Sequence, residues 1–313
     1  MSSTQTALGA RADFGARLGG WLTLARVSNT PTIVSNVLVG AALGGAREPS
    51  LELGLLVVAM VGFYTAGMLL NDVCDYHWDR EHRPDRPLVS GLVSRRAASV
   101  ATSGLFVLGL ALLWPLGSRA MLAGLVLIAC IVAYDVWHKT NPLSPLVMAI
   151  CRLLVYVTAC LAFAWPPPLM LAIAGGLLVL HLVGLTAIAK SEARPSMTGY
   201  WPAVLLLIAP LYFLLQAPGW LVQTPGPPAQ AAGLPAQVPV LAVADAVWLL
   251  TSMRLIYRPA PRRIGAAVAR LIAGISVLDL LILAALAAPP LFLALALLAF
   301  GLTLLLQRYI EGT

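Results

Sequence analysis

The chain has 313 residues, of which 60% are hydrophobic and only 11% are charged. A soluble enzyme of this length would show polar faces at helix or strand period, whereas whole stretches of about 20 residues here carry no charge, so the composition indicates a polytopic membrane protein. The net charge of +7 does not indicate binding to nucleic acid, because the arginines lie in loops between apolar segments and form no basic domain.

The four cysteines include no C-x-x-C pair, and three of them lie in apolar segments, where a small buried side chain is the expected role. No disulfide framework is therefore predicted. Residues 1–22 lack the apolar core and cleavage site of a signal peptide. They are predicted to form a short cytoplasmic tail that could include an interfacial helix.

Ten apolar segments follow, separated by proline, glycine or charged residues. Stretches of this length and composition are typical of membrane-spanning helices. The predicted fold is therefore all-α, a polytopic transmembrane bundle of nine or ten spans that forms one integral membrane domain over residues 1–313. The charge-free stretch 217–236 is predicted to be an extracytoplasmic linker loop. The segments are 27–45, 52–71, 98–117, 119–137, 143–164, 168–189, 201–216, 237–256, 264–287 and 289–307.

Assigning successive loops to alternate sides produces a strong charge asymmetry. Nearly all basic residues collect on one side, and only Arg47 and Arg119 lie on the other. By the positive-inside rule, the basic side is cytoplasmic. The segment 237–256 is the weakest, because it holds Asp245; if it is re-entrant or interfacial, there are nine spans and the C-terminus lies outside. Only two of the 20 basic residues are lysines, which is typical of a GC-rich bacterial genome, so the predicted location is the bacterial inner membrane.

The segment 71–91 places five carboxylates, three arginines and two histidines directly after an apolar stretch. If the preceding helix continues, Asn71, Asp75 and Asp79 recur at i, i+4 and i+8 on one helical face, and Asp72 lies about 100° round from them. Such a row of oxygens suits Mg²⁺, which prefers carboxylates and is commonly shared with substrate phosphates. The sequence therefore predicts a metal and diphosphate site on the cytoplasmic side. The alternative is a solvated loop between two apolar segments.

Positively charged side chains accompany this row. Arg83 and Arg86 follow it and could clamp phosphate oxygens. Arg152 falls inside an apolar segment, where a charge is costly, so it is expected to face a polar cavity; the alternative is snorkelling to the interface. Asn29 and Asn36 in the first segment could line the same cavity or make packing hydrogen bonds.

Two more polar clusters end apolar segments on the same side. Asp135 and Lys139 stand at i and i+4, which indicates either a helix-end ion pair or a phosphate contact by Lys139 that Asp135 orients. Lys190 and Glu192 end the sixth segment. Asp279 is a further ionisable group inside a segment, but its position in the sequence does not place it near the acidic row.

These residues resemble the motifs of the UbiA superfamily of intramembrane prenyltransferases. Tyr134, Asp135 and Lys139 are similar to a second segment of that family, and Arg26 with Pro31 to its first helix. Within the superfamily, the chain looks most like the EboC-like proteins. The first family motif, N-x-x-x-D-x-x-x-D followed by R-x-x-R-P, matches Asn71, Asp75, Asp79, Arg83, Arg86 and Pro87.

The resemblance implies an all-helical fold around a central cavity that opens to the cytoplasmic side and laterally to lipid. It implies Mg²⁺ as the cofactor, and a prenyl diphosphate and a small-molecule acceptor as ligands that meet among membrane lipids. The implied metal ligands are Asn71, Asp75 and Asp79. The implied catalytic residues are Asp72, Asp75, Asp79 and Lys139, and the implied substrate-binding residues are Asn71, Arg83, Arg86, Asp135, Arg152, Lys190 and Glu192.

The chain departs from the family after the sixth segment. Typical members carry a second D-x-x-x-D there, whereas this chain reads Ala-Ile-Ala-Lys-Ser-Glu. Glu192 could replace one metal ligand, and Lys190 could supply the charge of a second metal. The expected function is Mg²⁺-dependent transfer of a prenyl group from an isoprenoid diphosphate to a small aromatic or other lipophilic acceptor. The alternative is a catalytically degenerate UbiA-like protein that binds or transports a lipid or small metabolite.

Overall fold

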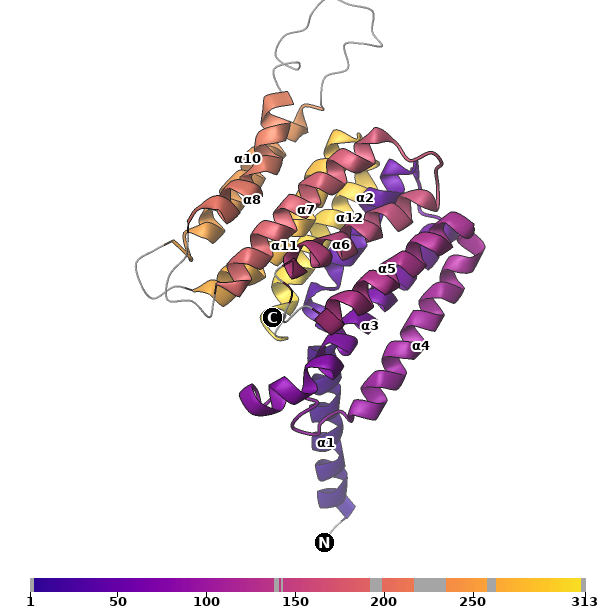
Figure 1. Cartoon of the computed structure of the whole chain (residues 1–313), viewed down its shortest axis with the longest axis vertical. Helices are drawn as coiled ribbons and strands as arrows, with labels where there is room; N and C mark the ends of the chain where they lie inside the picture. Colours follow the sequence, from indigo (N-terminus) through magenta and orange to yellow (C-terminus); the bar gives the residue numbers. More distant parts are fainter. Residues whose placement is uncertain are drawn as a thin grey trace, which may run out of the picture.

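The computed structural model describes residues 3–137, 141, 143–191, 199–216, 235–257 and 263–310. All regular structure in these ranges is helical, and Figure 1 shows the helices coloured along the chain. Two short 3-10 turns, Val27–Asn29 and Trp114–Leu116, accompany the α-helices. The α-helices are α1 (Ser3–Leu24), α2 (Pro31–Leu43), α3 (Leu51–His82), α4 (Arg95–Leu113), α5 (Ser118–Trp137), α6 (Ser144–Leu161), α7 (Leu169–Lys190), α8 (Trp201–Gln216), α10 (Gln237–Met253), α11 (Ile264–Ala285) and α12 (Pro290–Leu306).

The predicted all-α class is confirmed, and each of the ten apolar segments overlaps one of the described helices α2 to α12. α2 begins four residues after the start of the first apolar segment, at Pro31, because proline has no N–H to give and its fixed φ suits the first helical turn. α3 runs past its apolar segment to His82, so the condition for a single helical row of Asn71, Asp75 and Asp79 is met. The predicted linker 217–236 lies almost wholly outside the described residues.

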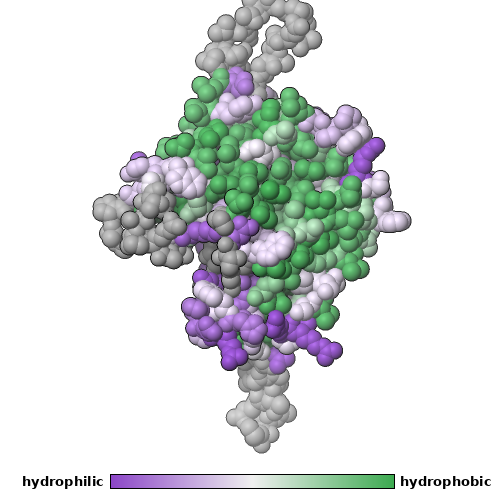
Figure 2. Space-filling view, viewed as in Figure 1, coloured by the Kyte–Doolittle hydropathy of each residue, from purple (hydrophilic) through white to green (hydrophobic). Residues whose placement is uncertain are grey.

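Six of the described helices are long and apolar enough to cross a membrane: α3, α4 (with the turn that follows it), α5, α6, α7 and α11. Four more apolar helices, α2 with its preceding turn, α8, α10 and α12, are shorter. Apolar side chains cover a broad band of the surface, and hydrophilic side chains gather near the end of the bundle from which α1 extends (Figure 2). Together these features support an integral membrane protein.

The short helix α2 lies at the centre of the bundle and contacts α3, α6, α11 and α12. Helices that follow one another along the chain also pack together, as short connections predict. All α2 residues from Ser35 to Leu43 are buried. Because α2 touches helices from both halves of the chain, its side chains can join groups that are far apart in the sequence.

Gly40 brings α2 into direct backbone contact with α6. A Cβ at this position would lie 2.5 Å from the Cβ of Ala159 and 2.5 Å from the backbone oxygen of Tyr156. Gly44, one turn later, faces the backbone oxygen of Cys160 in the same way. This spacing of small residues allows close helix packing in membranes.

We expect Gly40→Ala to lower the thermal stability of the protein in lipid. Overpacking in a close contact costs about 1–3 kcal/mol, and here one of the opposing atoms is backbone, which cannot rotate away. The matched control is Gly176→Ala in α7, where a Cβ would meet nothing within 4 Å. Equal melting temperatures for the two variants would contradict the close packing of α2 on α6.

Candidate functional site

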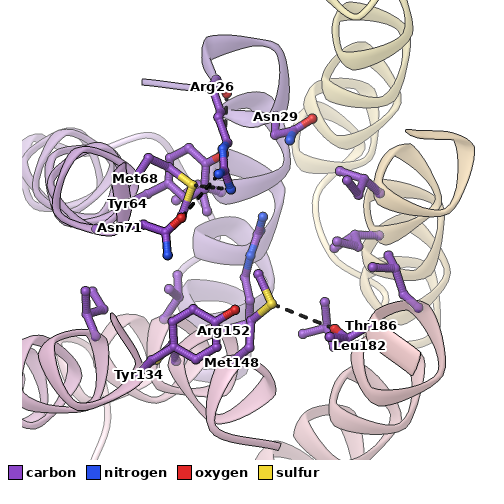
Figure 3. A pocket seen from close by; sticks show the side chains of 18 of the residues that line it. Arg26, Asn29, Tyr64, Met68, Asn71, Tyr134, Met148, Arg152, Leu182 and Thr186 are labelled. Atoms are coloured by element: carbon purple, nitrogen blue, oxygen red, sulfur yellow. Dashed lines mark hydrogen bonds between the residues drawn. The ribbon is translucent and has the colours of Figure 1, made fainter. Parts of the chain in front are cut away.

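A cavity of about 450 Å³ lies between α2, α3, α5, α6, α7 and α11 (Figure 3). Its lining is mostly apolar, with polar groups concentrated near the ends of α3, α5 and α7. We call this polar part the entrance. The entrance residues that line the cavity are Arg26, Asn71, Arg83, Asp135 and Lys190.

The face of α3 explains why Asn71 points into the cavity. Met60, Tyr64, Met68 and Asn71 all line it and recur at helical spacing. The carboxylates at Asp75 and Asp79 continue this row toward the end of the helix, beyond the lining residues. The predicted alignment on one helix is therefore present, with the amide inside the cavity and the carboxylates at its margin.

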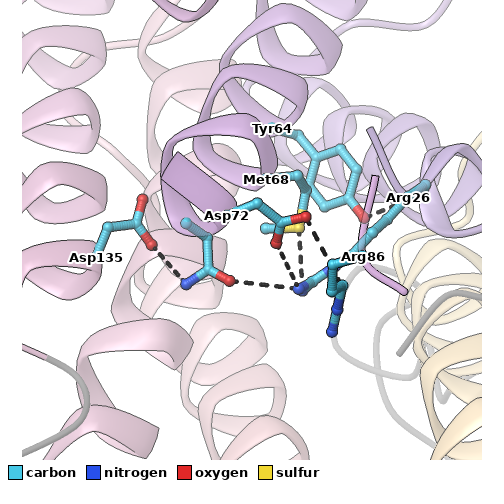
Figure 4. Close-up of polar contacts among 7 residues, drawn as sticks. Arg26, Tyr64, Met68, Asp72, Arg86 and Asp135 are labelled. Atoms are coloured by element: carbon cyan, nitrogen blue, oxygen red, sulfur yellow. Dashed lines mark hydrogen bonds and ion pairs between the residues drawn. The ribbon is translucent and has the colours of Figure 1, made fainter. Parts of the chain in front are cut away.

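Arg26 organises the entrance (Figure 4). Its Nη2 donates to Asn71 Oδ1 at 3.3 Å and lies 3.6 Å from Asp72 Oδ1, and its Nη1 donates to Met68 Sδ at 3.5 Å. The Tyr64 hydroxyl donates to the backbone oxygen of Arg26 at 3.4 Å. Arg26 adopts the left-handed conformation, with φ 44° and ψ 49°. A non-glycine residue held in this region often marks a functional site.

Asn71 connects α3 to α5, and Asp72 connects α3 to the loop that follows it. Asn71 Nδ2 donates to Asp135 Oδ1 at 3.2 Å. Asp72 is buried, and its Oδ2 lies 3.7 Å from Arg86 Nη1. Arg86 thus pairs with the acidic row and does not line the cavity, whereas Arg83 does. The two arginines of the predicted phosphate clamp have different surroundings.

On the other side of the entrance, Lys190 at the end of α7 donates from Nζ to Ser144 Oγ at 2.5 Å, at the start of α6. Arg152 lines the cavity two turns further along α6. It is half-buried and its guanidinium carbon lies 5.6 Å from the centre of the Tyr64 ring. Arg152 was expected to face a polar cavity; it lines this cavity, whose walls are mostly apolar.

Some of the predicted residues lie outside the cavity or outside the described residues. Lys139 and Glu192 lie outside the described residues. Of the two asparagines, Asn29 lines the cavity and Asn36 hydrogen-bonds to Arg152. The sequence reasoning left Arg26 out of the predicted site, although an arginine shortly before the first span, in a position that resembles the family's first helix, was the available signal.

The donor set fits Mg²⁺ held jointly with a ligand. Among the described residues, no three His, Cys, Asp or Glu side chains lie close enough to hold a metal by themselves. The buried Asp72 Oδ2 accepts no hydrogen bond from the described residues. Mg²⁺ is commonly bound by one or two carboxylates together with substrate phosphates. The hard oxygens of Asn71, Asp75 and Asp79 at the entrance are suited to that mode.

Comparison with known proteins gives a family match over most of the chain. The pattern of the UbiA prenyltransferase family matches residues 33–272. A 2-acylphloroglucinol 4-prenyltransferase of Humulus lupulus is 30% identical over 155 residues, which are 44% of this chain and 34% of the relative. A digeranylgeranylglyceryl phosphate synthase of Methanopyrus kandleri is 36% identical over 91 residues, which are 28% and 32% of the two chains. The chain therefore spans about a third of the length of these curated relatives.

Solved structures show the same fold. The apo structure of a UbiA homolog from Aeropyrum pernix K1 superimposes with a TM-score of 0.58 at 17% identity, covering 89% of this chain and 98% of the other. A UbiA homolog from Archaeoglobus fulgidus bound to GPP and Mg²⁺ gives a TM-score of 0.56 at 14% identity, covering 90% and 99%. At these identities the likeness concerns the fold alone.

Proposed function

Since the chain belongs to the UbiA prenyltransferase family, we propose that it transfers a prenyl group from an isoprenoid diphosphate to a small aromatic or other lipophilic acceptor. The observation that carries this proposal is the shape and polarity of the cavity. Its apolar interior suits an isoprenoid chain, and its entrance gathers Arg26, Arg83 and Lys190 where a diphosphate would lie. Burial of each chain methylene would contribute about 0.8 kcal/mol to binding.

In this reaction the bond between the allylic carbon and the diphosphate oxygen breaks, and the electron pair leaves with the diphosphate. The allylic carbon forms a new bond to the acceptor, which releases a proton. Arg26, Arg83 and Lys190 would stabilise the charge that grows on the leaving group, because cations already directed at that charge need little reorganisation during the reaction. Lys139, outside the described residues, is proposed to act in the same way.

Asn71, Asp75 and Asp79 are proposed to hold Mg²⁺, with Asp72 beside them. The metal would supply Lewis-acid stabilisation of the leaving diphosphate. Support comes from the donor set at the entrance and from the Archaeoglobus fulgidus homolog, which is bound to GPP and Mg²⁺. Arg86 is proposed to act through Asp72, and Asp135 through Asn71, because these are their hydrogen-bond or ion-pair partners. Glu192 stays a proposed substrate-binding residue.

The membrane placement is part of the same proposal. The entrance faces the cytoplasm of a bacterial inner membrane, and nine or ten helices span the bilayer. The asymmetry of the basic residues supports this orientation. The narrower likeness to EboC-like proteins is also proposed, on the motifs given above.

The test is release of diphosphate from geranyl diphosphate by the purified protein in lipid, with host-lysate lipids as acceptors. We expect diphosphate to be released in the presence of Mg²⁺, not to be released with EDTA, and to be released again when Mg²⁺ is restored. With geranyl diphosphate labelled in its geranyl group, the label should appear on an acceptor. Saturable binding of geranyl diphosphate without release would instead favour a catalytically degenerate protein that binds or transports a lipid. That alternative is considered because the second acidic motif of the family is missing at the end of α7. A lysine, Lys190, lines the entrance there instead.

A further inference from the structure

A buried polar network lies in the middle of the bundle, where α2, α6 and α11 meet. Asp279 of α11 is fully buried. Its Oδ2 accepts hydrogen bonds from Ser35 Oγ at 2.5 Å and Asn36 Nδ2 at 2.8 Å, and its Oδ1 accepts one from the Tyr156 hydroxyl. Both oxygens of this one carboxyl group are therefore occupied by donors from α2 and α6. A carboxylate placed in a membrane helix at such cost calls for a functional role.

Asn36 connects this carboxylate to the cavity. Its Oδ1 accepts from Arg152 Nη1 at 2.7 Å, while its Nδ2 donates to Asp279. A carboxylate only accepts hydrogen bonds and a guanidinium only donates them, so the amide of Asn36 can take one orientation between the two. Asp279 and Arg152 therefore impose the same orientation on Asn36, and the hydrogen bond to Asp279 anchors the amide with its oxygen toward Arg152.

Arg152 is held on three sides and open on another. Its Nη2 donates to Thr32 Oγ1 at 2.9 Å, and its guanidinium lies over the Tyr64 ring. Within the described residues these hydrogen bonds use two of its five N–H groups. Arg152 also lines the cavity, so part of the guanidinium is accessible from inside it (Figure 3).

The position of Arg152 separates it from Lys190 at the entrance. Lys190 is hydrogen-bonded to Ser144, eight residues before Arg152 on α6. At 1.5 Å per residue, the two α6 positions are about 12 Å apart along the helix axis. A diphosphate held beside Lys190 would leave Arg152 to a different polar group.

We propose that Asp279 is a positioning residue that acts through Asn36 to fix Arg152, and that the guanidinium of Arg152 binds an anionic group, a carboxylate or a phosphate, on the acceptor. The planar guanidinium suits both groups, and the apolar surroundings strengthen the charged hydrogen bonds. The identification of this ligand as the acceptor rests on the proposed function. The anion-binding property of Arg152 does not.

The test compares two probes of one shape, 4-hexylbenzoate and 4-hexylbenzamide, binding to the protein in lipid nanodiscs. We expect wild-type protein to bind the carboxylate at least about tenfold more tightly than the amide, as loss of a hydrogen bond to a charged group predicts. The ratio of the affinity for the carboxylate to that for the amide should fall to about one in Arg152→Gln. In Asp279→Asn the same ratio should fall most of the way to one. Adding Asp279→Asn to Arg152→Gln should change nothing further, because the positioning effect acts only through the guanidinium.

Asp245→Asn is the matched control, because Asp245 is also a fully buried carboxyl group in an apolar helix and does not line the cavity. It should keep the wild-type ratio. Equal binding of the two probes by wild-type protein, or a wild-type ratio in Asp279→Asn, would refute the proposal. If Asp279→Asn does not fold, Asn36→Ala breaks the same connection without changing a charge and must also lower the ratio. Failure of the geranyl diphosphate assay alone would refute the proposed function and leave the anion site standing.

Discussion

Asp75→Asn is expected to reduce Mg²⁺-dependent release of diphosphate from geranyl diphosphate by about 100-fold or more, the effect of removing one group that stabilises a leaving anion. Asparagine keeps the size of the side chain and removes the negative charge that would hold the metal. Asp79→Asn should act in the same direction, because Asp79 lies one helical turn further along the same row of α3. The measurement is the rate of diphosphate release as a function of Mg²⁺ concentration. Any activity that remains in the variants should require a higher Mg²⁺ concentration than in the wild-type protein.

Asp85→Asn provides the control for this experiment. Asp85 belongs to the same charged stretch but is exposed in the loop after α3. Its replacement should leave both the rate and the Mg²⁺ dependence unchanged. Wild-type turnover in both Asp75→Asn and Asp79→Asn would show that the acidic row of α3 is not the metal site.

Arg26→Gln is the second substitution with a large expected effect. Arg26 lines the cavity and contacts both Asn71 and Asp72. Its loss removes a fixed cation from the site of the leaving group, so kcat/KM for geranyl diphosphate should fall by about 100-fold. The folded protein should also be less stable, by about 1–3 kcal/mol, because the buried Asp72 loses one of its two cationic neighbours.

A double variant separates these two effects. Arg26→Gln combined with Asp72→Asn removes the unpaired charge, so it should regain much of the lost stability without regaining activity. Arg96→Gln, at an exposed arginine in the first turn of α4, should change neither quantity. If the double variant regained activity together with stability, Arg26 would have a purely structural role.

Much of the fold followed from the sequence because its signals are local. Apolar length and breaker residues located each of the described helices from α2 to α12, since a chain in lipid must satisfy its backbone hydrogen bonds within each segment. The spacing of Asn71, Asp75 and Asp79 predicted one helical face if the preceding helix continued, and α3 does continue to His82. Membership of the UbiA prenyltransferase family was likewise predicted from the motif residues and is confirmed.

The site was only partly predictable. The sequence named Asn71, Arg83, Asp135, Arg152 and Lys190, and all five line one cavity. It did not distinguish Arg83, which lines the cavity, from Arg86, which pairs with Asp72. Three residues apart on a loop, two identical side chains carry the same local signal, and only the path of the backbone decides what each one meets.

The sequence by itself determined that this protein is an all-helical membrane protein with an acidic row at the end of one helix and basic residues beside it. Only the tertiary structure decided that Arg26 joins that row, and that Asp279 is connected to Arg152 through Asn36. These partners are 45, 116 and 243 positions apart in the chain. Periodicity and charge describe one helix at a time, whereas contacts between distant helices depend on which faces pack together, and here the central helix α2 brings those faces together.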